Sequence, residues 1–163
     1  MDFQNEYYKD LWVLLCEARK HTTNVAPIDS VSQFRDGRNV ITYSRGDWLY
    51  REIYYGESVF SGEVGVLYKD KVIWTMHYRG KFLSETSRSL TNFCLKTAIK
   101  TQNPDSPLRG PKVITTSNGL YRYDNSIIGN LTEFKGRENV SVVINKERPY
   151  LVYQMVYSGG IIK

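Results

Sequence analysis

Residues 74–80 read Trp-Thr-Met-His-Tyr-Arg-Gly, and residues 153–159 read Tyr-Gln-Met-Val-Tyr-Ser-Gly, 79 positions later. In both stretches large apolar or aromatic residues alternate with smaller or polar ones, which is typical of a β-strand with one buried face. The chain contains a second pair of this kind, because residues 40–46 (Val-Ile-Thr-Tyr-Ser-Arg-Gly) resemble residues 113–119 (Val-Ile-Thr-Thr-Ser-Asn-Gly). These matches predict that the chain carries an internal duplication.

The predicted elements follow the same order in both halves. The first half shows helical spacing of apolar residues and then four strand-like segments, expected at 6–20, 40–44, 48–55, 63–69 and 72–79. The second half repeats this order, with a helix and four strands expected at 85–100, 112–117, 120–127, 139–145 and 150–158. We therefore expect one domain over residues 1–163, made of two repeats at about 6–82 and 83–163.

The fold class that follows is α+β, with antiparallel strands and one helix per copy packed on one face. Trp74, Met76 and Tyr78 are expected on one face of their strand, and Tyr153, Met155 and Tyr157 on one face of theirs. Two similar halves pack about a pseudo-two-fold axis, so we expect a groove there. The face opposite the helices is expected to be curved, aromatic and partly open.

The second helix has a predicted start and a predicted buried side. Ser84 is expected as its N-cap, with Glu85 in the first turn. Its buried stripe is expected to consist of Leu90, Phe93, Cys94, Thr97 and Ala98.

Composition excludes several classes of protein. The chain has 163 residues, 41% of them hydrophobic, and no apolar run long enough to cross a membrane. The acidic N-terminal stretch differs from a signal peptide, so we expect a cytoplasmic protein. Cys16 and Cys94 are far apart and are expected to act as small buried hydrophobic residues, so neither a metal nor a cofactor is expected. The net charge of +5 permits an anionic partner without requiring nucleic acid.

Tyrosine is the unusual component, with 13 residues. Aromatic side chains with a few polar anchors suit a flat organic ligand or a nucleobase. The same side chains can instead form the core beneath the helices, with their hydroxyl groups hydrogen-bonded. The core is the favoured interpretation for Trp74, Tyr78 and Tyr157, while both interpretations stay open for Tyr50, Tyr121 and Tyr123.

Arg51 and Arg122 are the leading candidates for a charged anchor, because each follows a Leu-Tyr pair. Strand alternation would place Arg51 in an otherwise apolar row, and an unpaired buried charge is costly. One hypothesis is that the two guanidinium groups bind a carboxylate or phosphate of a ligand. The alternative is that they pair with glutamates across the sheet, with Glu63 and Glu138 as partners.

Arg109 begins an Arg-Gly-Pro turn that leads into the second copy. The favoured interpretation is a structural clasp in which its guanidinium caps carbonyl groups between the halves, and the alternative is a phosphate contact at the groove mouth. His77 is expected to be an ordinary exposed residue, because no nucleophile or carboxylate can be assigned beside it. We expect no catalytic residue.

Several motifs together resemble a known family. They are Phe60-x-Gly-Glu, Trp74-x-Met-x-Tyr-x-Gly, Leu108-Arg-Gly-Pro, Phe134-x-Gly-x-Glu and Tyr157-x-Gly-Gly-Ile. This set resembles a bacterial domain family of unknown function that occurs alone or C-terminal to an Xre-type helix-turn-helix domain in transcriptional regulators. The resemblance implies a sensor or accessory module rather than an enzyme. Since no helix-turn-helix segment is expected before this domain, direct DNA binding is not implied.

Three functions remain at this point. The leading hypothesis is a non-enzymatic binding or sensor module that holds a small anionic or aromatic ligand, with nucleotides among the candidates, in the groove between the repeats. The second is a protein-interaction or regulatory module without a ligand, which uses exposed aromatic residues for a homodimer or a partner protein. The third is a metal-independent ribonuclease that uses Arg, Lys and Tyr side chains.

Overall fold

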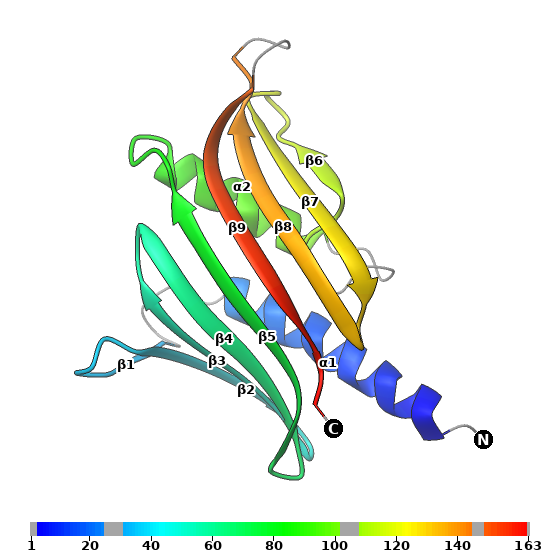
Figure 1. The fold of residues 1–163 in the computed structure, drawn as a ribbon. Helices are drawn as coiled ribbons and strands as arrows, with labels where there is room; N and C mark the ends of the chain where they lie inside the picture. Colours follow the sequence, from blue (N-terminus) through cyan, green and yellow to red (C-terminus); the bar gives the residue numbers. More distant parts are fainter. Residues whose placement is uncertain (1–2, 25–30, 102–107, 145–148, 163) are drawn as a thin grey trace.

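The computed structural model of the chain describes residues 3–24, 31–101, 108–144 and 149–162. These residues form an α+β fold with two helices and a single nine-stranded antiparallel sheet, not two separate sheets (Figure 1). The elements in chain order are α1 (Phe3–Asn24), β1 (Ser32–Gln33), β2 (Asn39–Arg45), β3 (Trp48–Gly56), β4 (Val59–Tyr68), β5 (Lys71–Phe82), α2 (Arg88–Lys100), β6 (Val113–Thr115), β7 (Tyr121–Asn130), β8 (Glu133–Val142) and β9 (Tyr150–Ile161).

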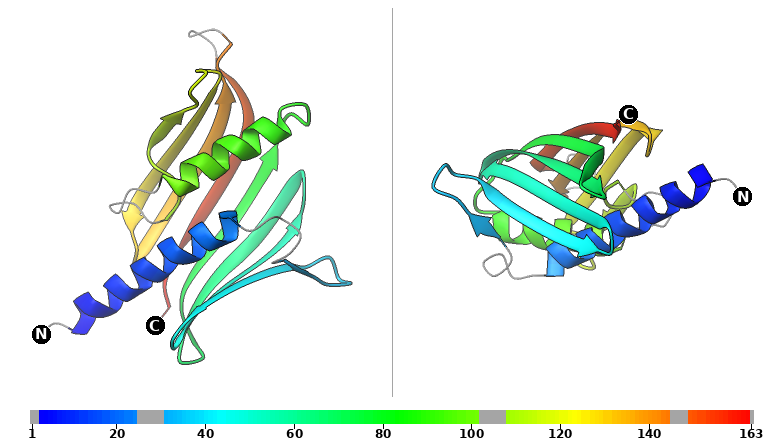
Figure 2. Two further views of the ribbon diagram at one scale, coloured as in Figure 1. Left: turned by 180° about the vertical axis from the view of Figure 1, so that it is seen from behind. Right: turned by 90° about the horizontal axis from the view of Figure 1, so that it is seen from below.

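The strand order is β1-β2-β3-β4-β5-β9-β8-β7-β6. From the central pair β5 and β9, the strands of each half therefore run outward in reverse chain order, and the short β1 extends the first half. Tyr78 and Tyr157 are direct partners at the centre of this pair. Both helices lie across the same face of the sheet (Figure 2).

The surroundings of the two central tyrosines are alike. Gly62 on β4 pairs with Tyr78, and Gly136 on β8 pairs with Tyr157. A Cβ atom on either glycine would collide with the ring of its paired tyrosine, so both positions need a residue without a side chain. The ring of each central tyrosine thus lies directly over the neighbouring strand.

Register shifts occur at matching places in the two halves. One lies between Val66 and Leu67 where β4 pairs with β5, and the other between Val140 and Ser141 where β8 pairs with β9. At each register shift one strand has an extra, unpaired residue, which bends that strand and increases the local twist. The two outer parts of the sheet are therefore curved at corresponding distances from the centre.

Strand pairing corrects the correspondence expected between the copies. Followed outward from the central pair, the pairings place Tyr50 opposite Val66 on β4 and Tyr123 opposite Val140 on β8. Tyr50 thus corresponds in position to Tyr123, and Arg51 corresponds to Asp124 rather than to Arg122. The match of Leu49-Tyr50-Arg51 with Leu120-Tyr121-Arg122 is therefore two residues out of register. The turn before β7 is longer than the turn before β3, so Leu120 lies in the turn and not in the strand.

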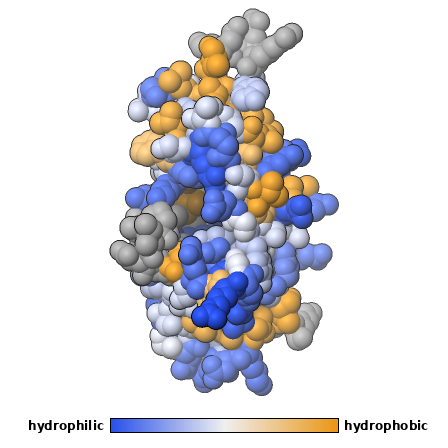
Figure 3. All heavy atoms as spheres, turned by 90° about the vertical axis from the view of Figure 1, so that its left-hand side faces the viewer, coloured by the Kyte–Doolittle hydropathy of each residue, from blue (hydrophilic) through white to orange (hydrophobic). Residues whose placement is uncertain are grey.

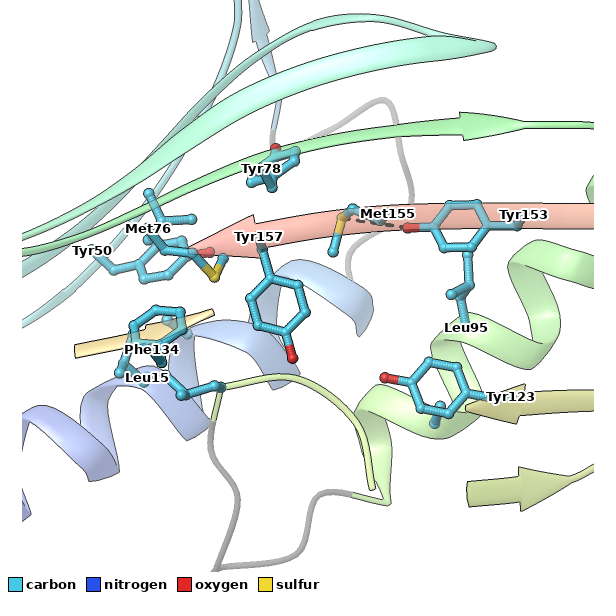
Figure 4. Close-up of a cluster of buried hydrophobic side chains, with 14 of the residues drawn as sticks. Leu15, Tyr50, Met76, Tyr78, Leu95, Tyr123, Phe134, Tyr153, Met155 and Tyr157 are labelled. Carbon is cyan, nitrogen blue, oxygen red and sulfur yellow. Dashed lines mark hydrogen bonds between the residues drawn. The ribbon is translucent and has the colours of Figure 1, made fainter. Parts of the chain in front are cut away.

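The core lies between the helices and the sheet, and it is rich in aromatic residues (Figure 4). The predicted alternation is confirmed, because both expected triplets, Trp74-Met76-Tyr78 and Tyr153-Met155-Tyr157, are buried on the helix side. Helix α1 contributes Leu11, Leu14, Leu15 and Ala18. The expectation of an open aromatic face is wrong: the large aromatic side chains gather under the helices, because burial of that much apolar area is strongly favourable.

The second helix differs from the prediction in start and in phase. It begins at Arg88, and its N-cap Ser87 makes no capping hydrogen bond from its side chain. Leu90 and Phe93, which were expected to be buried, are 52% and 62% exposed. The predicted burial of Cys94 and Ala98 is confirmed, but Thr91 and Leu95 complete the buried side in place of Leu90 and Phe93.

Residues 21–39 are polar and include Pro27 and Asp29, which predicts a loop, yet part of this segment forms regular structure. Helix α1 extends to Asn24, and the strand Ser32–Gln33 pairs with β2. Pro27 and Asp29 lie outside the described residues, as do residues 103–107 and 146–148 of two proline-containing segments that predict turns. In the part of the chain that is described, neither helix is apolar enough over a sufficient length to cross a membrane.

Candidate functional site

The centre of the candidate site is a buried carboxylate, Glu138 on β8, whose side chain is fully inaccessible to solvent. It accepts two hydrogen bonds from Arg109, from Nε at 2.8 Å and from Nη2 at 2.9 Å. It also accepts from the hydroxyl groups of Tyr123 at 2.8 Å and Tyr153 at 3.1 Å. Four charge-assisted hydrogen bonds therefore compensate for removing this carboxylate from water.

The ionisation of this cluster follows from its burial and its one close ion pair. Burial acts to raise the pKa of Glu138, but the Arg109 guanidinium and the hydrogen bonds from Tyr123 and Tyr153 together outweigh burial and hold that pKa below its ordinary value. Burial, followed by the Glu138 charge, raises the pKa of Tyr123 far above its ordinary range. Glu138 is therefore ionised and Tyr123 neutral at physiological pH.

The turn after Arg109 is held by side chains from the sheet. The Gly110 N–H donates to the Tyr123 hydroxyl at 3.1 Å, and Asn125 Nδ2 donates to the Gly110 carbonyl at 2.9 Å. Asn125 Oδ1 in turn accepts from the Tyr157 hydroxyl at 2.6 Å. The expected clasp is therefore wrong: the Arg109 guanidinium binds the carboxylate of Glu138 in its own half and not carbonyl groups between the halves, and the sheet side chains bind the backbone of the turn.

The first half carries a second carboxylate, Glu52 on β3. Its two oxygens accept from the Tyr50 hydroxyl at 2.9 Å and from the Tyr78 hydroxyl at 2.5 Å. Unlike Glu138, Glu52 is only partly buried. Both tyrosines have a raised pKa, through burial first and the Glu52 charge second.

A groove of about 510 Å³ opens beside these two clusters, between the helix layer and strands β3, β5 and β9. Aromatic rings form much of its wall, namely Tyr54, Phe60, Tyr78, Phe82 and Tyr153. Polar groups reach it from Glu52 and Arg109 and from Arg88 and Asn92 on α2. In Figure 3 the side that carries the outer strands of the first half shows a hollow with hydrophobic residues inside and hydrophilic residues around it.

Arg109 has a donor that the cluster does not use. Its Nε and Nη2 bind Glu138, while no hydrogen bond from Nη1 is found within the described residues. The side chain is 15% exposed and is among the groove-lining residues. The rigid pairing with Glu138 fixes the guanidinium plane, so the position of Nη1 is fixed as well.

The structure separates the residues that sequence reasoning placed together. Tyr78 and Arg109 line the groove. The other aromatic candidates lie in the core under the helices: Tyr50, Trp74, Tyr121, Tyr123 and Tyr157. Trp74, for example, donates its indole N–H to the Leu131 carbonyl at 3.0 Å, as a buried tryptophan usually does.

The paired arginines lie on the opposite face, away from the groove. Arg51 is exposed, so it does not occupy a buried apolar row. Arg122 pairs with Asp124 on its own strand, with Nη2 and Oδ1 2.8 Å apart, and not with Glu138. The other expected partner, Glu63, lies 3.3 Å from His77.

Sequence reasoning missed Glu52 and the pairing of Arg109 with Glu138. A signal for the pairing exists in the strand alternation: Glu138 shares its face with Phe134 and Val140, both of which are buried. A carboxylate in such a row requires a cation, and Arg109 is close to it only in the folded chain. The same signal exists for Glu52, which shares its strand face with Tyr50 and Tyr54.

Comparison with known proteins gives a family for this chain without giving an activity. Neither a search of characterised proteins nor a search of solved structures finds a match. A family model described as a domain of unknown function, DUF5680, matches residues 52–162, which include all strands from β4 to β9 and every residue of the Glu138 cluster. The chain therefore belongs to the DUF5680 family.

Proposed function

We propose that this domain is a non-enzymatic binding module that holds a small aromatic molecule with an acidic group in the groove between the helices and the sheet. The observation that carries this proposal is the combination of an aromatic wall and a few fixed polar groups in one groove. Small-molecule sites have this composition, in which apolar walls supply affinity and a few polar groups fix orientation. Nucleotides belong to this ligand class.

Arg109 is the proposed anchor for the acidic group. Its guanidinium is already held by Glu138, so binding through the spare Nη1 requires no loss of side-chain freedom. Arg88 at the rim is also fixed, because it contacts Glu85 at 3.0 Å and lies 4.9 Å from the centre of the Phe82 ring. The aromatic part of the ligand would lie against Phe60 and Phe82.

Ligand binding would affect α2 first, because Arg88, Asn92 and Ile99 of that helix line the groove. The outer side of the same helix carries the exposed Leu90 and Phe93. We propose that occupancy changes how this side meets a partner protein. We propose that the domain acts in this way as an accessory module of cytoplasmic, Xre-type transcriptional regulators, as the family resemblance implies.

We also propose that the fold arose by duplication of a helix-plus-four-strand unit. The mirrored strand order, the matching register shifts and the glycine-tyrosine pairs on both sides of the centre support this origin. Under this proposal the groove lies beside the pseudo-two-fold axis, but most of its wall comes from the first copy, while α2, Arg109 and β9 of the second copy supply the rest. The two copies would then have diverged in function.

Native mass spectrometry of the freshly purified protein, compared with its denatured spectrum, is the first test. We expect a discrete extra mass that disappears on denaturation and identifies the ligand. Asn92→Trp would fill the groove from α2, and Ser89→Trp, at an exposed position of the same helix outside the groove, is the matched control. With that ligand, we expect Asn92→Trp to weaken binding at least tenfold and Ser89→Trp to leave it unchanged; equal affinity in both variants would contradict the proposal.

The exposed Leu90 and Phe93 favour a second candidate function, protein docking without a ligand. A clean dimer mass with no bound molecule would support it. Leu90→Ser with Phe93→Ser would then return the protein to a monomer without loss of folding, because neither side chain is buried.

A further inference from the structure

The sheet face opposite the helices carries a hollow of about 650 Å³ over strands β5, β7, β8 and β9. Four basic side chains lie around its floor, His77 and Arg79 on β5 and Lys135 and Arg137 on β8, and we call them the cation array. All four are exposed, on the opposite side of the sheet from the groove.

Strand pairing sets the dimensions of the cation array. Arg79 and Arg137 are both direct partners of Val156 on β9, one from each side. His77 and Lys135 flank Ser158 in the same way. With neighbouring strands about 4.8 Å apart and two residues spanning about 7 Å along a strand, the four side chains start from a rectangle of about 10 by 7 Å.

One corner of the array already has a carboxylate beside it. His77 lies 3.3 Å from Glu63, whereas no ion pair is found for Arg79, Lys135 or Arg137 within the residues that the structure describes. Like charges gathered on one surface repel each other, and an anionic partner relieves that repulsion. The array is thus complementary to an acidic surface.

The middle of the hollow is apolar and aliphatic. Val156 is 53% exposed and Ile128 is 65% exposed, and both lie among the basic residues. Single-stranded nucleic acid would need aromatic rings on which bases can stack, and the hollow has none beyond the buried Tyr78 and Tyr157 beneath it. Aliphatic side chains between cations favour a protein partner that has both acidic and apolar side chains.

We propose that this face docks an extended acidic segment of a partner protein along β9. In an extended segment, side chains two residues apart point the same way and lie about 7 Å apart, which matches the spacing within the array along β5 and β8. Carboxylates at this spacing would meet the cations, and an apolar side chain two residues further along, on the same side of the segment, would cover Val156 and Ile128. The proposal does not depend on a ligand in the groove, because the two sites lie on opposite faces.

A labelled seven-residue peptide tests the proposal by fluorescence polarisation with the full chain; it has glutamate at positions 1, 3 and 7, valine at position 5 and serine at the positions between, so that glutamate and valine lie on one side. Arg79→Glu with Arg137→Glu reverses two charges of the array. Arg51→Glu with Lys71→Glu reverses two exposed charges outside the hollow and gives the same net charge. We expect the array variant to bind the peptide at least about tenfold more weakly than the control variant, in line with the loss and reversal of two ion pairs.

Three results would overturn the proposal. The first is an equal loss of affinity in both variants, which would show attraction by net charge alone. The second is an absence of peptide binding to the unaltered chain at low salt. The third is tighter binding of a single-stranded oligonucleotide of equal charge with the same sensitivity to the array variant, which would assign the face to nucleic acid. Unchanged melting temperatures would show that the variants are folded.

Discussion

The two halves of this domain contain corresponding positions with different chemistry. Tyr50 and Glu52 in the first half correspond to Tyr123 and Asn125 in the second, while Glu138 of the second half corresponds to Val64 of the first. Each half thus has one carboxylate that receives two tyrosine hydroxyl groups. The difference lies in exposure, because Glu138 is sealed and paired with Arg109, whereas Glu52 faces the groove.

This difference indicates a division of roles. A sealed, fully hydrogen-bonded ion pair fixes the position of the elements around it and tolerates little change. A partly exposed carboxylate beside an open groove can exchange partners at low cost. We therefore interpret the Glu138 cluster as the rigid support that fixes Arg109 beside the groove, and Glu52 as the carboxylate whose hydrogen bonds can rearrange.

The largest effect that would separate the two clusters is expected from Arg109→Met. It leaves Glu138 charged and buried without a counter-charge, so we expect the free energy of unfolding to fall by about 3–5 kcal/mol. Glu52→Gln, the matched change in the first half, should cost about 1 kcal/mol, because one hydrogen bond is weakened at a partly hydrated site. Urea denaturation of both variants measures the contrast, and equal losses would remove the distinction between the clusters.

Removal of both charges is the control for that variant. Arg109→Met with Glu138→Gln removes both charges of the pair and keeps an amide for Tyr123 and Tyr153 to contact. We expect it to recover part of the stability that Arg109→Met loses.

The Glu138 pair also predicts how stability depends on pH. Its pKa in the folded protein lies below its ordinary value of 4.5, so folding favours the ionised form. The stabilisation is fully present above about pH 4.5 and is lost as the pH falls through the lower folded value. Melting temperatures between pH 3 and pH 7 should show this decline in the natural chain and a smaller one in the doubly substituted chain; identical profiles would argue against it.

A smaller difference in stability is expected between variants of the two central tyrosines. Tyr157→Phe leaves the buried Asn125 Oδ1 without its donor, and we expect a loss of about 1–2 kcal/mol. Tyr78→Phe removes a donor from Glu52, which keeps Tyr50 and contact with the groove, so the loss should be below about 1 kcal/mol. The melting temperatures of the two variants measure this difference. A larger decrease for Tyr78→Phe than for Tyr157→Phe would contradict our assignment of roles to the two clusters.

The smallest effect on stability is expected on the sheet face opposite the helices. Arg122→Gln breaks an exposed ion pair with Asp124, and such pairs contribute at most about 1 kcal/mol. We expect a change in stability within about 0.5 kcal/mol and no change in ligand binding. A measurable loss of ligand binding would return the anchoring role to the arginine pair that the Leu-Tyr-Arg match first suggested.

Much of the fold could be predicted from the alternation of residues along the strands. Eight of the nine strands overlap a segment that turns and period-two patterns predicted, although β4 begins four residues and β8 six residues before the predicted start, and the buried faces of β5 and β9 were assigned correctly. These features are local, so the sequence determines them directly. The ninth strand, Ser32–Gln33, has two residues and no pattern that could reveal it.

The errors come from properties that depend on the folded chain. Leu90 and Phe93 are apolar, yet the phase of α2 is set by the face that meets the sheet, and that face carries Thr91 and Leu95. Likewise, identical letters matched Arg51 with Arg122, whereas hydrogen-bond register matches Arg51 with Asp124. Register across a sheet depends on turn lengths several strands away, which a pairwise match of letters does not contain.

The candidate site was only half accessible to sequence reasoning for the same reason. Tyr78 and Arg109 were proposed and do line the groove. The partner of Arg109 is Glu138, 29 positions further along the chain, and the closeness of the two depends on where the chain turns after α2. Burial of a carboxylate can be predicted from alternation, but its partner cannot.

The central position of β9 has a consequence for how this chain folds as it is made. Strand β9 is the last strand in the sequence, yet it lies between β5 and β8 and joins the two halves of the sheet. During synthesis the first four-stranded unit can pair early through short hairpins, while β8 must wait for residues 150–161 before its inner edge is covered. Until those residues leave the ribosome, two unpaired strand edges are exposed to other nascent chains, so loss of β9 should damage folding far more than loss of the short outer strand β6.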